Sequence, residues 1–365
     1  MPAGPLPEVA APNAFMNLKI LLLPGDGIGA EVTAAAVDVL HAVASKFGHK
    51  LEFTEALIGG IAIHKTGSPL PQDTIDKALA ADATLMGAVG LPEFDNATPD
   101  KRPEKGLLGI RKALGVFANL RPVRTWPALV ESSPLKNHLV EGTDMIIVRE
   151  LTGGLYYGEP RGIFDDYAVN TMRYTTPEIQ RVARKAFQLA RARRKKLTSV
   201  DKSNVIENSQ LWRRVVIEIA KEFPDVELDH LLVDNCAMQL VLNPRRFDVI
   251  LTENMFGDIL SDEGAVLAGS IGMLPSASLG ESKGLYEPVH GSAPDIAGQN
   301  KANPLGAIGS AAAMLEYTYG LMKEAAAVNA AIGKVLDAGQ VTADLKPKGK
   351  PSTTSEVGKA VSEAL

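Results

Sequence analysis

The chain has 365 residues, of which 45% are hydrophobic and 22% charged, and its formal net charge is −5. This composition is typical of globular proteins and gives no electrostatic footprint for binding nucleic acid or an anionic membrane, so small molecules are the expected partners. No uncharged apolar stretch approaches the roughly 20 residues that span a bilayer, the single cysteine excludes an internal disulfide, and we expect a cytoplasmic protein of about two domains.

The first fifteen residues, "MPAGPLPEVAAPNAF", contain four prolines and no basic residue. They match neither a secretory signal nor an Arg-rich transit peptide. We predict that residues 1–15 form a disordered extension and that Met16 is the native start.

Apolar runs then alternate with helical patterns. Strands are expected at "LKILLLPG" (18–25), "LEFTEAL" (51–57) and "ATLMGAVG" (83–90), and helices at about 30–47 and 72–80. This alternation is the βαβ rhythm of a mostly parallel α/β sheet.

The turn "PGDGIGA" (24–30) matches G-x-G-x-x-A between a strand and a helix, and Glu52 lies near the distance of a ribose-binding acid. However, Asp26 would place a carboxylate beside a pyrophosphate in a loop whose N–H groups should face negative charge. We therefore predict a Gly-rich strand-to-helix turn rather than a Rossmann nucleotide site.

Charged residues end or follow several apolar runs of the middle segment, namely Arg121, Arg149, Lys202, Asp234, Asp258 and Asp262. Ligands of open α/β sheets bind beyond the carboxyl ends of strands, so these charges can converge on one site. The alternative is that each strand ends in a charge because it reaches the surface.

The acids Asp234, Asp258 and Asp262 offer hard oxygen ligands without a His or Cys at zinc spacing, which suits Mg²⁺ or Mn²⁺. Asp258 and Asp262 are four residues apart and would repel each other on one helix face without a cation between them. The alternative for this pair is a solvated helix face.

Three arginines, Arg111, Arg121 and Arg149, could each grip a carboxylate bidentately, although Arg111 could also be a surface residue. Tyr156, in "GGLYYGEP", could pack or donate a proton. The basic run at 191–196 is expected to end a helix that begins near Pro177. The loop 286–304 is too rich in Gly, Pro and small polar residues for a helix or strand and could wrap a nucleotide.

Taken together, several motifs resemble the isocitrate/isopropylmalate dehydrogenase family of β-decarboxylating dehydrogenases, and in particular its isopropylmalate branch. They are "LLPGDGIGAE", "FANLRPVR", "RELTGGLYYGEPRG", "DKSNV", "VDN", "TENMFGDILSDE" and "EPVHGSAPDIAGQNKANP". The resemblance runs from about Asn17 to the C-terminus. It implies a two-domain fold with a mostly parallel sheet and a non-Rossmann nucleotide site. Residues 16–116 and 269–365 would form the nucleotide-binding domain and residues 117–268 the middle domain of a homodimer with shared active sites.

The resemblance also assigns roles to individual residues. Arg111, Arg121 and Arg149 would hold substrate carboxylates, while Asp258, Asp262 and Asp234 of the partner subunit would bind Mg²⁺ or Mn²⁺ and contact substrate. Lys202 of the partner subunit and Tyr156 match the acid–base pair. The substrate side chain would meet Glu104, Leu107 and Leu108. NAD would be held by residues of the 286–304 loop, namely Glu287, His290, Gly291, Ser292, Ala293, Pro294, Asp295, Ile296 and Asn303.

The activity implied is NAD-dependent oxidation and decarboxylation of (2R,3S)-3-isopropylmalate to 4-methyl-2-oxopentanoate, a step of leucine biosynthesis. Lys202 would relay the hydroxyl proton during hydride transfer, and Tyr156 would protonate the carbon that loses CO₂. Asp295 would favour NAD over NADP because it accepts from ribose hydroxyls and repels a 2′-phosphate. Two alternatives remain open: Mg²⁺-dependent phosphoryl transfer, which lacks a P-loop here, and a binding-only relative.

Overall fold

The structure is a computed structural model that describes residues 15–365. The predicted disorder of the N-terminal extension falls on residues 1–15, which lie outside the described residues except for Phe15. The strands of the main sheet are β1 (Asn17–Gly25), β2 (Lys50–Glu55), β3 (Ala83–Ala88), β4 (Ala118–Arg124), β5 (Asp144–Glu150), β8 (Lys196–Asp201), β9 (Glu227–Leu232), β10 (Val249–Thr252), β11 (Pro275–Leu279) and β12 (Gly284–Pro288).

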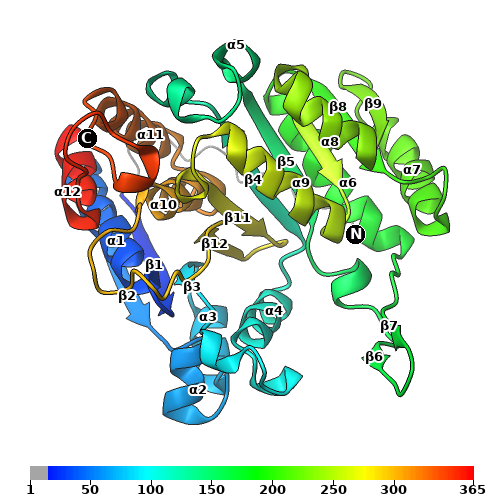
Figure 1. The fold of residues 1–365 in the computed structure, drawn as a ribbon, viewed down its shortest axis with the longest axis horizontal. Coiled ribbons are helices and arrows are strands. Elements are labelled where there is room, and N and C mark those ends of the chain that lie inside the picture. Colours follow the sequence, from blue (N-terminus) through cyan, green and yellow to red (C-terminus); the bar gives the residue numbers. More distant parts are fainter. Residues whose placement is uncertain (1–14) are drawn as a thin grey trace.

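Helices cover this sheet, and a short hairpin stands away from it (Figure 1). The helices are α1 (Gly29–Phe47), α2 (Gly60–Thr66), α3 (Gln72–Ala80), α4 (Pro103–Leu114), α5 (Asn137–Val140), α6 (Thr176–Ala192), α7 (Glu207–Ala220), α8 (Val233–Leu242), α9 (Asn254–Leu267), α10 (Leu305–Tyr317), α11 (Met322–Asp337) and α12 (Thr354–Ala364). The hairpin strands are β6 (Gly162–Ile163) and β7 (Ala168–Val169).

The ten strands form one sheet in the order β2-β1-β3-β12-β11-β4-β5-β10-β8-β9. Neighbours are parallel at both ends of this order and antiparallel only between β12, β11, β4 and β5. The prediction of a mostly parallel α/β sheet is confirmed. In this spatial order, the strands from β2 across to β11 come from the two chain ends, and those from β4 across to β9 come from the middle segment. The domain boundaries at 116 and 268 stay a prediction.

Buried apolar residues explain these elements. Every residue of β3 is buried, as expected for a strand covered on both faces. The predicted helices at about 30–47 and 72–80 are α1 and α3. Helix α6 begins at a capping box formed by Thr175 and Glu178 and ends at Ala192. The basic run 191–196 ends this helix as predicted, and Arg193 bonds Asp248 at 2.8 Å.

The Gly-rich turn after β1 differs from a Rossmann loop, because it carries a carboxylate that accepts hydrogen bonds from neighbouring segments. The buried Asp26 accepts hydrogen bonds of 2.8 Å from the backbone N–H groups of Gly60, Ile61 and Gly90. Gly27 has φ 56°, and a Cβ there would lie 2.0 Å from the Ser292 carbonyl oxygen. The turn is therefore a packing element, as the sequence predicted.

Two expected boundaries are wrong. Arg121 does not end its strand but lies in the middle of β4, which continues to Arg124. Residues 286–288 were expected in a loop but belong to β12, where Tyr286 pairs with Ala277 of β11. Its glycine and proline content concealed this short strand, which pairs with the nearby β11 and with the distant β3. Within the described residues, no helix combines the length and apolar character that a membrane span requires.

Candidate active site

A pocket of about 240 Å³ lies where the two halves of the sheet meet. Its wall comes from α4, the end of β3, the central strands, α9 and the segment that follows β12. The charged and apolar side chains that line it include Glu104, Leu107, Arg111, Arg121, Arg149 and Asp258. The three predicted arginines therefore converge, although they come from a helix and two antiparallel strands.

Arg111 lies in the last turn of α4 and is buried. Its Nη2 donates a 2.7 Å hydrogen bond to Glu287 Oε1, and both side chains are about nine-tenths buried. Burial lowers the pKa of Arg111, but the Glu287 carboxylate outweighs it and raises that pKa. Arg111 is therefore not a surface arginine, and Glu287, predicted to contact the cofactor, is engaged by an arginine.

Arg121 and Arg149 come from the neighbouring strands β4 and β5 and are held by neutral amides. Arg121 Nε donates to Asn119 Oδ1 at 2.9 Å. Arg149 donates to Asn254 Oδ1 through Nε at 3.1 Å and through Nη2 at 2.7 Å. Burial, together with the neighbouring Arg149, lowers the pKa of Arg121 to about 10, a value at which the group stays charged at neutral pH.

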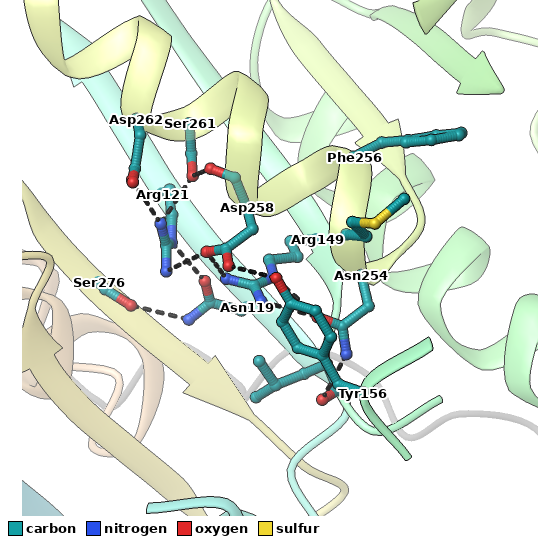
Figure 2. Close-up of polar contacts among 12 residues, drawn as sticks. Asn119, Arg121, Arg149, Tyr156, Asn254, Phe256, Asp258, Ser261, Asp262 and Ser276 are labelled. Carbon is teal, nitrogen blue, oxygen red and sulfur yellow. Dashed lines mark hydrogen bonds and ion pairs between the residues drawn. The ribbon is translucent and has the colours of Figure 1, made fainter. Parts of the chain in front are cut away.

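Asp258 and Asp262 lie one turn apart on α9 and face these arginines (Figure 2). Asp258 forms an ion pair with Arg149 and lies 3.6 Å from Arg121. Asp262 lies 3.3 Å from Arg121, and burial raises its pKa. The positive groups that offset the two acids in this structure are thus guanidinium groups.

Tyr156 lies on a short 3₁₀ turn, Gly154–Tyr156, that follows β5. Its hydroxyl donates a 2.8 Å hydrogen bond to Asp258 Oδ2, and the two side chains point toward each other in Figure 2. Burial and this hydrogen bond raise the pKa of Tyr156 to about 12. The phenol is therefore protonated at neutral pH and half-buried beside the pocket.

Lys202 and Asp234 form a separate pair. Lys202 follows β8, Asp234 is in the first turn of α8, and Lys202 Nζ lies 2.8 Å from Asp234 Oδ1. The Asp234 side chain is 62% exposed. Neither residue lines the pocket. Within residues 15–365, no cluster of three or more His, Cys, Asp or Glu could hold a metal.

The segment 289–304 is anchored beside the pocket. His290 and Gly291 line it, and the Ser292 carbonyl accepts from Ile28 N at 2.8 Å. Ala293 adopts φ 38°, after which Pro294 and Asp295 are exposed, and Ile296 packs against the core. Within the described residues the Asp295 side chain has no hydrogen bond, so it is open to a ligand.

Asn303 is engaged elsewhere. Its Oδ1 accepts from Leu305 N at 3.0 Å, and its Nδ2 donates to Asp344 at 3.0 Å. Both ends of this buried amide are therefore satisfied within the chain, which favours a structural role over the predicted cofactor contact.

The apolar wall contains one of the two predicted leucines. Leu107 lies one turn before Arg111 on α4 and lines the pocket, as does Glu104. Leu108 also lies on α4 but does not line it. The periodicity of a helix explains this difference, because adjacent residues point about 100° apart.

Sequence reasoning missed the two asparagines that hold the arginines. Asn119 precedes Arg121 by two residues, so both side chains lie on one face of β4, and that spacing is visible in the motif "FANLR". Asn254 is the first residue of α9. No local pattern relates it to Arg149, because the contact joins a helix to a strand 105 positions away.

The donor groups fit the absent cofactors. Asp258 and Asp262 present hard carboxylate oxygens at the pocket, and Mg²⁺ and Mn²⁺ are commonly held by one or two carboxylates completed by substrate oxygens. Within the 289–304 segment, the buried Nε2 of His290 has no hydrogen-bond partner among the described residues. This orphaned atom and the open Asp295 carboxylate fit a nucleotide with ribose hydroxyls.

Comparisons with known proteins concern the sequence and the fold of the chain. A family model described as isocitrate/isopropylmalate dehydrogenase matches residues 19–361. Curated 3-isopropylmalate dehydrogenases of Heyndrickxia coagulans and Geobacillus kaustophilus are 56% and 57% identical to the chain, and each alignment covers 96% of the chain and 97% or 96% of the relative.

Solved structures also match the fold. An isocitrate dehydrogenase from Methylococcus capsulatus superposes with a TM-score of 0.85 at 36% identity, covering 95% of this chain and 99% of that one. A β-decarboxylating dehydrogenase from Thermococcus kodakarensis, in its apo form, gives a TM-score of 0.79 at 36% identity and covers 96% of both chains.

Proposed function

The chain belongs to the isocitrate/isopropylmalate dehydrogenase family, and from that premise we propose that it oxidises and decarboxylates (2R,3S)-3-isopropylmalate to 4-methyl-2-oxopentanoate with NAD⁺. The observation that carries the proposal is the convergence of three buried arginines and Asp258 on one pocket, with Asp262 paired to Arg121 and the protonated Tyr156 bonded to Asp258. A dicarboxylate substrate needs such arginines, and a carbanion-like product of CO₂ loss needs a proton donor.

The choice of isopropylmalate over isocitrate rests on sequence and on the pocket wall. The relatives called 3-isopropylmalate dehydrogenase are 56% and 57% identical to the chain, compared with 36% for the isocitrate dehydrogenase. Leu107 presents an apolar surface one turn from Arg111, which suits an isopropyl group and not a third carboxylate.

The residues divide the chemistry as follows. The three arginines bind and orient the two carboxylates of the substrate. Bound NAD⁺ would accept the hydride, and a bound Mg²⁺ or Mn²⁺, held by Asp258 and Asp262, would stabilise negative charge on substrate oxygen. Lys202 takes the hydroxyl proton, and Tyr156, whose pKa of about 12 keeps it protonated, donates a proton to carbon.

Lys202 and Asp234 can serve this chemistry only as contributions from a second copy, so we propose a homodimer. The helices that carry the acids also carry exposed apolar side chains, among them Met238 and Leu242 on α8 and Ile259 on α9, exposed by 56%, 61% and 60%. Helices α8 and α9 pack against each other, so these side chains can form one continuous apolar face. Burying this face would bring Lys202 and Asp234 to the pocket of the partner.

The sheet order also supports the proposed domain division. The strands of 16–116 and 269–365 occupy one half of the sheet and those of 117–268 occupy the other. The pocket lies between the halves, as expected for a site built from two domains.

The test is steady-state turnover of isopropylmalate, isocitrate, homoisocitrate, tartrate and malate, each with Mg²⁺ and either NAD⁺ or NADP⁺. We expect the highest kcat/KM for isopropylmalate with NAD⁺. We also expect that Asp295→Lys with Ile296→Tyr shifts the preference toward NADP⁺ by removing a repulsive charge and adding donors. Turnover of any of the other four acids at higher efficiency would overturn the substrate assignment, and equal use of NADP⁺ by the parent would remove Asp295 from the ribose.

A further inference from the structure

The three arginines of the pocket are held by two kinds of partner. Arg111 is held by a carboxylate, Glu287, at 2.7 Å. Arg121 and Arg149 are held by the amides of Asn119 and Asn254. These amides add no charge, so Arg121 and Arg149 are offset only by Asp258 and Asp262.

We propose that Asn119 and Asn254 are positioning residues that fix the direction of Arg121 and Arg149 without adding a further negative charge beside them, where it would repel the substrate carboxylates. The proposal rests on the proposed function in one respect, namely that the ligand of the pocket is a dicarboxylate.

The hydrogen bonds fix which end of each amide faces the arginine. Asn254 Nδ2 donates to the carbonyl oxygens of Leu151 and Gly153 at 3.0 and 3.2 Å, so its Oδ1 must face Arg149. Asn119 Nδ2 donates to the hydroxyls of Ser276 and Ser278 at 2.7 and 2.9 Å. Because a guanidinium only donates, Asn119 Oδ1 must likewise face Arg121.

The hydrogen-bond partners require an amide at position 254 but not at position 119. An aspartate at 254 would turn a carboxylate oxygen toward two backbone carbonyls, which are acceptors and would repel it. An aspartate at 119 would face Ser276 and Ser278, whose hydroxyls can rotate to donate. Asn119 could therefore be a carboxylate without loss of fit, and the amide there calls for an electrostatic explanation.

The charges in front of the arginines complete the argument. Asp258 and Asp262 are the acids that form ion pairs with Arg121 or Arg149, and no other acid of residues 15–365 does so. These are also the carboxylates proposed to bind the divalent ion. Arg111, Arg121 and Arg149 are already balanced in charge by Glu287, Asp258 and Asp262, so a carboxylate at 119 or 254 would make this cluster net negative and repel a dicarboxylate.

The test compares three variants of the full chain, two changed at position 119 and one changed on the surface. Asn119→Asp adds a carboxylate, Asn119→Ser removes the amide without adding charge, and Asn137→Asp on the exposed start of α5 controls for net charge. Binding of 3-isopropylmalate is measured by calorimetry without NAD⁺, and thermal melts and the KM and kcat for substrate and NAD⁺ are measured beside it.

We expect Asn119→Asp to melt like the parent, to weaken 3-isopropylmalate binding and raise its KM by about ten-fold or more, and to leave the KM for NAD⁺ unchanged. Asn119→Ser, which loses the hydrogen bond to Arg121 without adding charge, should weaken binding by a smaller factor than Asn119→Asp, and Asn137→Asp should bind within about three-fold of the parent. A merely structural role would instead lower the melting temperature of both 119 variants and weaken binding equally.

Parent-like affinity in Asn119→Asp would overturn the proposal. Should that variant not fold, parent-like affinity in Asn119→Ser would overturn it, because the hydrogen bond that directs Arg121 would then be dispensable. If the parent oxidises isocitrate or malate and not isopropylmalate, the proposed function fails, and the same comparison made with that substrate still decides the role of Asn119.

Discussion

Two clusters of charged side chains in this chain differ in how many partners surround them. The cleft cluster, consisting of Arg121, Arg149, Tyr156, Asp258 and Asp262, is interlocked by hydrogen bonds and ion pairs within one chain (Figure 2). The Lys202–Asp234 pair has a single 2.8 Å contact, and the Asp234 side chain is 62% exposed. The charged side chains of the cleft cluster thus have several partners within the chain, whereas Lys202 and Asp234 have one contact with each other.

This difference indicates which residues the proposed second chain would complete. Arginines in the cleft cluster are buried and fully satisfied, so their geometry is set before any ligand binds. The pair stands beside the exposed apolar side chains of α8, and the stacked rings of Phe164 and Tyr167 on the β6–β7 hairpin are also exposed. Large exposed apolar areas mark interaction surfaces, which is why we place the pair in the active site of a partner.

The largest expected effect comes from mixing subunits. Lys202→Met and Asp258→Asn homodimers should each lose activity by about 10²–10⁴-fold. Heterodimers purified with two different tags should recover about half of the parent activity, because one of two shared sites then contains both native residues. The recovery is measured as NADH formation per heterodimer.

Absence of recovery in these heterodimers would mean that the cleft cluster and the Lys202–Asp234 pair act within one chain. The matched control is a heterodimer of a Lys202→Met and a parent subunit, which should also keep about half of the activity because one site is intact.

The second prediction concerns the metal. Asp258→Asn and Asp234→Asn should each weaken Mn²⁺ binding by at least about ten-fold in the presence of substrate, because each removes a hard carboxylate ligand. Calorimetry of Mn²⁺ binding checks this, with the exposed Glu141→Gln as control. Excess Mn²⁺ should partly rescue turnover.

Parent-like Mn²⁺ affinity in Asp234→Asn would remove that residue from the metal site and leave the pair without a role. The same result in Asp258→Asn would mean that the two acids of α9 serve only to balance Arg121 and Arg149.

A smaller effect is expected at the apolar wall of the cleft. Leu107→Ala should cost about 1–3 kcal/mol in discrimination for isopropylmalate over malate, because the isopropyl group loses contacts. Leu108→Ala should leave that ratio unchanged, since Leu108 does not line the pocket. Ratios of kcat/KM with melts run in parallel separate specificity from stability, and equal shifts in both variants would contradict the pocket geometry.

The smallest effect on turnover is expected at Glu150, whose carboxyl is fully buried and lies outside the cleft. Burial raises its pKa from 4.5 to about 7. Because the folded state then holds its proton more tightly than the unfolded state, stability should fall as pH rises from about 4.5 to 7 and level off above, by up to ~1.4 kcal/mol per pH unit. Urea titrations at several pH values check this.

Glu150→Gln should flatten that pH dependence, although it loses one of the acceptors for the N–H groups of Thr152 and Gly153. An unchanged slope in the glutamine variant would mean that another group titrates, and that burial of Glu150 does not limit stability.

Much of the fold was predictable because the signals are local. The helices α1 and α3, the capping of α6 and the Gly-rich turn at Asp26 follow from periodicity, capping residues and turn residues within a few positions. The hydrogen bonds that saturate Asp26 come from residues 34 to 64 positions away. The strand at 284–288 and the true end of β4 were not predicted, because strand boundaries depend on pairing with other strands, such as β3 for the former.

The sequence by itself determined the chemical types at the site: arginines for carboxylates, acids for a hard cation and a tyrosine beside paired glycines. Only the tertiary structure decided their partners. It joined Arg149 to an amide at the start of α9, engaged Glu287 with Arg111, satisfied Asn303 internally and left Leu108 off the pocket. The physical reason is that side-chain chemistry is a property of one residue, whereas hydrogen-bond satisfaction and burial depend on which distant segments the sheet brings together.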